Sequence, residues 1–209
     1  MCSGGCAKCL GITLIPLAIL SVLANILLFF PAGSVAENNE HISREVFCLG
    51  GLLGSGILMI FPALVFLGMK NNDCCGCCGN ESCGKRFAMF SSILFAAIGF
   101  TGAAYNFIVS AVAIHNGPIC YVGPLRGWEY AFKDGDYLRD KTIWNRCLKD
   151  TSGLDTKVII TWNLTLFCIL LIIGLVQGVL CAIQAINGLI GTICGDCKCC
   201  GCCGNDGPV

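Results

Sequence analysis

The apolar residues of the chain collect into four runs that contain no Asp, Glu, Lys, Arg or His. These runs cover residues 10–30, 46–69, 87–114 and 158–193. About 20 residues of helix cross the roughly 30 Å hydrocarbon core of a bilayer, so each run is long enough to span it. We therefore predict four transmembrane helices, at residues 10–30, 46–69, 87–114 and 166–193, with residues 158–165 as flanking or interfacial chain.

A soluble helical bundle is the alternative, but its buried helices would show polar stripes at helical spacing, and none of the runs has one. The first run is too long for the apolar region of a secretory signal and lacks a small-residue cleavage site, which indicates an uncleaved anchor. Composition agrees, since 12% of the residues are charged, against about 25% in soluble proteins. The predicted fold class is an all-α membrane protein, a four-transmembrane-helix bundle with a small disulfide-stapled extracellular loop domain.

The distribution of cysteines, and not that of Lys and Arg, indicates which side of the membrane each tail and loop occupies. Lys and Arg number five in the tails and central loop and eight in the other two loops, so they do not decide the orientation. Fourteen of the 19 cysteines lie in the tails and central loop, mostly as adjacent pairs that are awkward to bridge in an oxidising space. We therefore predict cytoplasmic segments at residues 1–9, 70–86 and 194–209, and extracellular loops at residues 31–45 and 115–165.

These fourteen cysteines all lie beside a predicted span, which is the usual position for reversible S-acylation. Zinc is a rival, because Cys74 to Cys77 and Cys194 to Cys197 have C-x₂-C spacing. Plain reduced thiols are the third interpretation. Neither cluster contains a His and the pairs offer several registers, so we predict no metal site and no cofactor. The S-acylation candidates are Cys2, Cys6, Cys9, Cys74, Cys75, Cys77, Cys78, Cys83, Cys194, Cys197, Cys199, Cys200, Cys202 and Cys203.

The second extracellular loop is the one segment large enough to form a small ectodomain. Cys120 and Cys147 are its two cysteines, and a bridge between them would close a loop of about 28 residues, worth on the order of 3 to 4 kcal/mol in the chain-entropy model. Its aromatic side chains either pack within the loop and on the bilayer interface or form a partner-binding face. The residues proposed for that face are Trp128, Tyr130, Tyr137 and Trp144.

Inside the spans the sequence contains amides and closely spaced small residues, and no ionisable group other than Cys and Tyr. This argues against ion-coupled transport, which generally uses charged residues there. Amides can hydrogen-bond between helices, and small residues four apart allow close packing, within the bundle or against other membrane proteins. The helix-packing candidates are Asn25, Gly50, Gly54, Asn106, Gly174 and Gly178.

Two N-glycosylation sequons occur, at Asn80 and Asn163. The first is predicted to be cytosolic. Asn163 is on the exterior side, but it is accessible only if the last span begins several residues later, and otherwise it is an interfacial residue beside Trp162. Asn163 is therefore the predicted glycosylation site.

Four segments of the chain match a known family. They are residues 1–11 with Cys2, Cys6 and Cys9, the Cys-Cys-Gly-Cys-Cys-Gly loop of residues 71–86, Trp-Asn-Leu-Thr at 162–165, and Cys-Gly-Asp-Cys at 194–197. From end to end the chain resembles the transmembrane-4 L-six family of tetraspanin-like proteins. Tetraspanins themselves carry Cys-Cys-Gly in the large loop, and this loop has none.

The resemblance implies a non-enzymatic, multi-pass organiser of plasma-membrane complexes that regulates adhesion, migration and density-dependent proliferation. It also implies integrins, tetraspanins or other membrane proteins as partners, in addition to the lipid bilayer. A small-solute channel or transporter is the alternative function. An enzyme is disfavoured because His41 and His115 lie far from the Cys clusters and on the other face of the membrane. The zero net charge, without a basic block, argues against a nucleic-acid partner.

Overall fold

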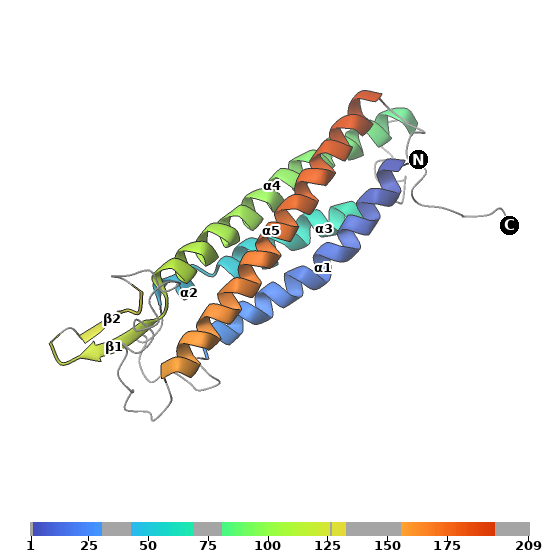
Figure 1. Ribbon diagram of the computed structural model, residues 1–209. Helices are drawn as coiled ribbons and strands as arrows, with labels where there is room; N and C mark the ends of the chain where they lie inside the picture. The colour runs from blue at the N-terminus through green and yellow to red at the C-terminus, as the bar shows by residue number, and fades with distance from the viewer. Residues whose placement is uncertain (1, 31–42, 69–80, 126, 133–155, 195–209) are drawn as a thin grey trace.

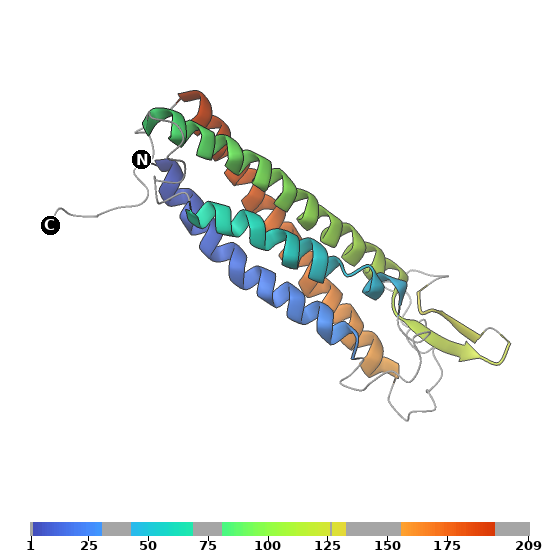
Figure 2. The ribbon, with the colours of Figure 1, turned by 180° about the vertical axis from the view of Figure 1, so that it is seen from behind.

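The computed structural model describes residues 2–30, 43–68, 81–125, 127–132 and 156–194, with backbone alone at residues 2–5, 81–86, 156, 191 and 194. Within these residues four segments are long and apolar enough to cross a membrane: Cys6–Leu28, Arg44–Gly68, Phe87–Asn116 and Lys157–Ile190. They run side by side as one elongated bundle, seen from opposite sides in Figures 1 and 2. The predicted four-helix membrane fold is confirmed.

Three of the spans are single helices, and the second is built from three pieces. The single helices are α1 (Cys2–Leu28), α4 (Glu81–Asn116) and α5 (Thr156–Cys194). The second span consists of α2 (Arg44–Phe47), η3 (Gly50–Ile57) and α3 (Leu58–Gly68). Helix α4 packs most extensively against α5, while α1 contacts α3, η3 and α5.

The segment η3 is a π-helix, which the hydrophobic pattern did not predict. It follows Leu49, which adopts the left-handed conformation with φ 50° and interrupts the regular helix. Glycines within η3 allow the backbone to approach neighbouring helices closely. A Cβ on Gly54 would lie 2.5 Å from the carbonyl oxygen of Gly102 in α4, so the two backbones touch there. Irregular helix of this kind is frequent at functional sites.

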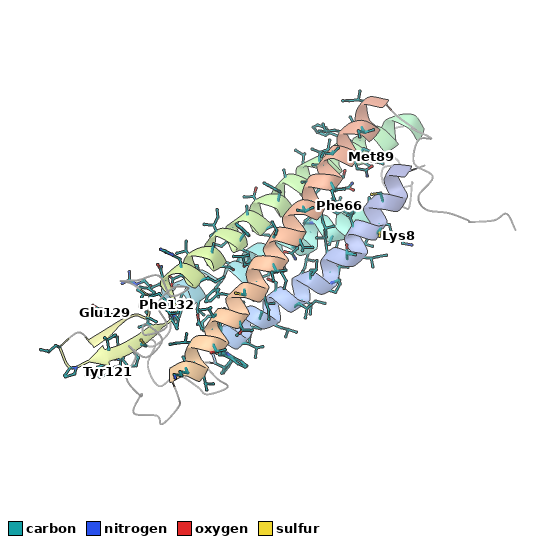
Figure 3. The ribbon with its side chains drawn as sticks, in the orientation of Figure 1. Lys8, Phe66, Met89, Tyr121, Glu129 and Phe132 are labelled. Atoms are coloured by element: carbon teal, nitrogen blue, oxygen red, sulfur yellow. The ribbon has the colours of Figure 1, made fainter. Side chains whose placement is uncertain are left out.

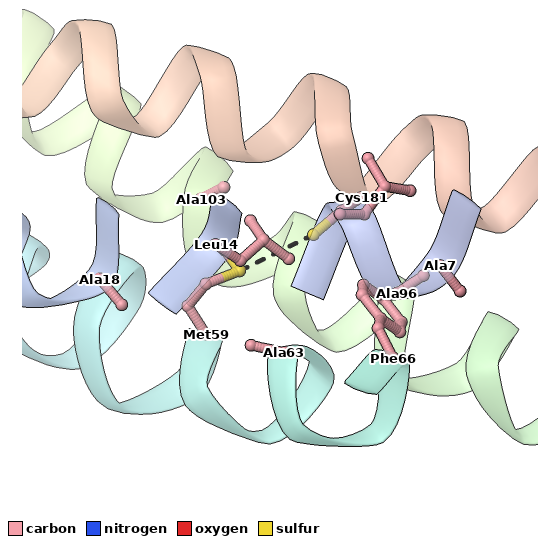
Figure 4. Close-up of a cluster of buried hydrophobic side chains, with 10 residues drawn as sticks. Ala7, Leu14, Ala18, Met59, Ala63, Phe66, Ala96, Ala103 and Cys181 are labelled. Carbon is pink, nitrogen blue, oxygen red and sulfur yellow. Dashed lines mark hydrogen bonds between the residues drawn. The ribbon is translucent and has the colours of Figure 1, made fainter. Parts of the chain in front are cut away.

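Two apolar clusters form the core of the bundle, one toward each end. The cluster nearer the N-terminal end of α1, which we call the inner cluster, includes Leu14, Met59, Phe66 and Cys181 (Figure 4). The end of the bundle that holds the hairpin is called the outer end. The outer cluster includes Leu28, Val46, Ala113, Phe167 and Leu170. Most side chains that face away from the core are large and apolar, as on Ile108 and Ile172. This outer surface suits contact with lipid.

Between the two clusters, each span contributes buried polar residues at an intermediate height. We call this group the polar layer, and its members are Ser21, Asn25, Ser55, Asn106, Ser110 and Gln177. Polar side chains are costly in a membrane unless they bond to one another or to backbone, so this layer marks where the helices must fit together.

A two-stranded antiparallel hairpin extends from one end of the bundle, and no strand was predicted there. Strand β1 (Ile119–Gly123) pairs with β2 (Gly127–Tyr130), with Tyr121 opposite Trp128 and an irregularity after Tyr121. Figure 3 places Tyr121 and Glu129 at this end and Lys8 and Met89 toward the other. The hairpin end also contains the finish of α4 and the start of α5.

Candidate functional site

The hairpin is fixed to the bundle through one buried carboxylate. Glu45, in α2, is 8% exposed. Asn116 at the end of α4 donates from Nδ2 to Glu45 Oε1 at 2.9 Å, and Tyr130 in β2 donates from its hydroxyl to Oε2 at 3.3 Å. We call these three residues the outer junction. It joins the second span, the third span and the hairpin by bonds to a charged group, which are among the stronger hydrogen bonds in proteins.

Backbone bonds and apolar packing reinforce this attachment. The amide of Ala131 donates to the Pro118 carbonyl at 2.9 Å, and that of Phe132 donates to the Asn116 carbonyl at 3.2 Å. The Phe132 ring packs over Gly117, whose φ of +71° turns the chain from α4 into β1. A buried cluster of Cys120, Ala131, Phe132 and Ile160 then seats the base of the hairpin on α5.

The place of Tyr130 in the outer junction raises the pKa of its hydroxyl. Burial of its hydroxyl raises the pKa of Tyr130 above the ordinary value of 10.0, and the negative charge of Glu45 and the bond to Glu45 raise it further. Nearby Arg44 acts in the opposite direction. The neutral phenol is therefore the form that the docked hairpin favours.

The turn at the far end of the hairpin is exposed, and Tyr121 and Trp128 beside it are half-buried. Tyr121 and Trp128 form a tilted ring pair with centroids 5.8 Å apart. Leu125, in the turn, is 99% exposed. Of the four predicted loop aromatics, Trp128 thus lies on the outer part of the hairpin and Tyr130 turns inward to Glu45, while Tyr137 and Trp144 lie outside the described residues.

Cys120 in β1 is disulfide-bonded. Its predicted partner, Cys147, lies outside the described residues, so the pairing of these two cysteines remains a prediction. The predicted glycosylation residue, Asn163, lies within α5 and is half-buried. Its neighbour Trp162 donates from Nε1 to the Leu27 carbonyl at 3.3 Å, which ties the outer ends of α1 and α5 together.

The S-acylation candidates in the described chain belong to the opposite end of the bundle. Cys2, Cys6 and Cys9 are in the first turns of α1, Cys83 is at the start of α4 and Cys194 ends α5. Cys6 is half-buried and Cys9 is an exposed free thiol. The structure thus brings helix ends with candidates from three segments to one end of the molecule (Figure 1). The other candidates lie outside the described residues: Cys74, Cys75, Cys77, Cys78, Cys197, Cys199, Cys200, Cys202 and Cys203.

The polar layer is held together by side chains that bond to the backbone of neighbouring helices. Two of these bonds end on carbonyls of η3: Ser21 Oγ donates to Gly51 at 3.0 Å, and Gln177 Nε2 donates to Ser55 at 3.0 Å. Asn106 Nδ2 donates to the Leu170 carbonyl in α5 at 2.9 Å. The π-helix is therefore clamped from both α1 and α5.

A second group of polar side chains lies nearer the N-terminal end of α1, centred on the buried pair of Gln184 and Ser92, which we call the Gln184 pair. Gln184 Nε2 donates to Ser92 Oγ at 3.4 Å, and Gln184 Oε1 accepts from Asn187 Nδ2 at 3.3 Å. Between Gln177 and Gln184 on α5 is Cys181, whose thiol contacts the Met59 sulfur at 3.8 Å (Figure 4). A Cβ on Gly99 would lie 2.8 Å from that thiol, so the packing here is tight.

The predicted packing glycines differ in how closely they are approached. A Cβ on Gly174 would lie 3.1 Å from the Ala103 carbonyl oxygen, and one on Gly50 would lie 3.3 Å from Asn106 Oδ1. Gly178 has more room, with nothing nearer than 3.8 Å. Gly51 was not predicted as a packing residue from the spacing of small residues, but a Cβ there would lie 2.9 Å from the Ser21 carbonyl oxygen. Asn25, beside it, is buried.

Comparison with known proteins agrees with the fold and the motifs. A family model described as L6 membrane protein matches residues 1–198. The chain is 63% identical to Transmembrane 4 L6 family member 4 of Homo sapiens and 65% identical to that of Mus musculus, each over 209 residues and 100% of both chains. It is 47% identical to Transmembrane 4 L6 family member 1 of Homo sapiens over 90% of this chain and 91% of that protein. No solved structure matches. The chain is a member of the L6 membrane protein family, a tetraspanin-like family of multi-pass membrane proteins.

Proposed function

We propose that this protein is a non-enzymatic organiser of membrane complexes, which uses the hairpin as a contact surface for other membrane proteins. The observation that carries the proposal is the outer junction. A hairpin held by a buried carboxylate and an apolar base presents Leu125 and the Tyr121–Trp128 pair in a fixed arrangement. A pre-ordered surface loses less conformational freedom on binding, and aromatic residues are enriched in protein interfaces.

The proposed setting is the plasma membrane, with the hairpin outside and both termini in the cytoplasm. The disulfide at Cys120 supports this sidedness, because such bonds persist in oxidising compartments, and the free thiol of Cys9 is at the opposite end. S-acylation of cysteines at that end would place acyl chains beside the helices and select lipid neighbours. A Cys120–Cys147 bridge and a glycan on Asn163 belong to the same proposal.

The family resemblance supplies the biological context of the proposal. Integrins and tetraspanins are the expected neighbours, and adhesion, migration and density-dependent proliferation are the processes that the assembled complexes would regulate. The apolar outer surface of the bundle offers a second, lateral contact with such partners in the membrane.

The alternative, a small-solute channel, would need the buried polar groups to form a continuous path. Tight packing of Cys181 against Met59 and Gly99 lies between the polar layer and the Gln184 pair and argues against one. Reconstitution in bilayers tests this directly: a current that depends on the protein would support the channel.

Chemical cross-linking on intact cells, followed by identification of the attached proteins, tests the organiser. The expected result is a restricted set of membrane proteins attached to the wild-type chain and lost on Leu125→Asp. Ile193→Asp is the matched control, because it makes the same change at an exposed position at the opposite end. Recovery of only abundant, unrelated proteins, unchanged in Leu125→Asp, would overturn the proposal.

A further inference from the structure

Three atoms of the polar layer lack a hydrogen-bond partner within the described part of the chain: Asn25 Oδ1, Ser55 Oγ and Gln177 Oε1. Ser55 and Gln177 are fully buried, and Asn25 is 2% exposed. They come from three different elements, α1, η3 and α5. A buried polar atom without a partner is unfavourable, so three of them along η3 call for a ligand.

Two of these atoms are on residues that already touch. The bond from Gln177 Nε2 to the Ser55 backbone carbonyl, at 3.0 Å, places the Gln177 amide against the residue whose hydroxyl lacks a partner. Exchanging the oxygen and nitrogen of the Gln177 amide would not remove the deficit, since it would place two carbonyl groups together and leave the amino group unpartnered. Whichever way the amide points, the site lacks one polar partner.

The chemistry of the site selects a neutral ligand that can donate and accept. Gln177 Oε1 accepts only, whereas the Ser55 hydroxyl can donate or accept. The runs 10–30, 46–69, 87–114 and 158–193, which supply every residue of the polar layer, contain no carboxylate, so a cation there would have no adjacent counter-charge and would be costly in the membrane. Water meets the requirement, because it can donate to Gln177 Oε1 and bond to Ser55 Oγ at once.

The surrounding backbone provides a reason for the site to form here. Ser55 lies within the π-helix η3, and Gly178, next to Gln177, has nothing nearer to an added Cβ than the Ala103 Cβ at 3.8 Å. One turn along, Asn25 lies against Gly51, where the added Cβ would be 3.0 Å from the Asn25 Cβ. Asn25 Oδ1 is therefore a further acceptor without a hydrogen-bond partner, beside η3 and nearer the hairpin end than Ser55.

We propose that the polar layer is an internal water-binding site, in which water bridges Ser55 Oγ and Gln177 Oε1 beside the π-helix η3. The site is confined, because the packing of Cys181 against Met59 and Gly99 separates it from the Gln184 pair. It does not depend on the proposed function of the hairpin.

The chain contains only two glutamines, Gln177 and Gln184, which makes the test unusually specific. Both are fully buried on α5, but Gln184 has protein partners for both ends of its amide. The full-length protein, labelled with ¹⁵N-glutamine in lipid bilayers, is measured by solid-state NMR for magnetisation transfer from water to the two side-chain amides. Gln184→Met assigns the signals by removing one of them.

The expected result is a transfer rate several-fold higher at Gln177 than at Gln184, and a lower rate at Gln177 in Ser55→Ala. Slow transfer at both glutamines would overturn the proposal. Equally fast transfer at both would also overturn it, because the water would then be continuous and the channel would gain support. Ser21→Ala is the control, since its hydroxyl already bonds to Gly51 and its loss leaves the Ser55–Gln177 site intact.

Discussion

The hydroxyl of Tyr130 in the hairpin bonds to the carboxylate of Glu45 in the second span, across 85 positions of sequence. The same carboxylate accepts from Asn116, at the end of the third span. Glu45 is therefore the point at which the extramembrane hairpin and two spans meet. Because Glu45 belongs to the second span, the way this span packs in the bundle sets the position of the hairpin.

Replacing Glu45 by Ala should loosen the hairpin and leave the bundle folded. The change leaves Asn116 Nδ2 and the Tyr130 hydroxyl without their acceptor, which costs about 1 to 3 kcal/mol. Hydrogen–deuterium exchange should rise in β1 and β2 and stay unchanged in the inner half of α4. Glu45→Gln, which retains an acceptor oxygen, should have a smaller effect. Equal protection of the hairpin in Glu45→Ala and wild type would show that the junction does not hold it.

The hairpin should detach in alkali as Tyr130 ionises. Burial and the charge of Glu45 raise its pKa in the docked hairpin above 10.0, so docking favours the neutral form. The stabilisation is fully present below the ordinary pKa and is lost as the pH rises through the raised one. A spectrophotometric titration of tyrosinate, taken as the difference between wild type and Tyr130→Phe, measures this pKa.

Glu45→Gln provides the control for that titration. Removing the negative charge should move the titration of Tyr130 to lower pH, while burial keeps it above the ordinary value. A difference curve centred at or below the ordinary value in the wild type would contradict the docked arrangement.

Gly54→Ala should destabilise the bundle by about 1 to 3 kcal/mol, the usual cost of overpacking. The new Cβ would lie 2.5 Å from the Gly102 carbonyl oxygen, which is backbone and cannot move without separating η3 from α4. Gly178→Ala is the matched control, because its nearest atom is 3.8 Å away. Thermal unfolding in the same detergent compares the two variants, and similar melting temperatures would contradict the close approach.

Cys147→Ser should release Cys120 as a free thiol. In the denatured wild-type protein Cys120 should react with maleimide only after reduction, since it is disulfide-bonded in the structure. In the Cys147→Ser variant it should react without reductant, as mass spectrometry of its peptide would show. Protection of Cys120 in that variant would assign the bridge to another cysteine.

The four spans are predictable because a bilayer demands long apolar helices, and residues 10–30 or 87–114 meet that demand without any knowledge of packing. The break at Leu49 and the π-helix after it could not be predicted in this way. The run that begins at Val46 is equally apolar whether its residues form an α-helix or a π-helix. The hairpin was missed because the alternation of Ile119 to Tyr130 is short and interrupted by Gly123 and Pro124.

Some residues of the candidate site can also be predicted from the sequence, and others cannot. Amides such as Asn106 and Gln177 stand out in an apolar sequence, so their importance can be inferred before their partners are known. Glu45 gives no such signal, because a carboxylate just before a span is ordinary until Tyr130 and Asn116 are seen to face it. The spacing of small residues marks Gly54 and Gly178 alike, although only Gly54 has a backbone against it.

The central claim is that the hairpin, held by Glu45, contacts other membrane proteins. Site-specific photo-cross-linking in cells tests it most directly, with the photoreactive residue at position 125 and, as control, at the lipid-facing position 108. The account predicts a few discrete protein adducts from position 125 that fall several-fold in the Glu45→Ala background, while adducts from position 108 do not change. Absence of discrete adducts from position 125, or adducts that persist unchanged without Glu45, would contradict it.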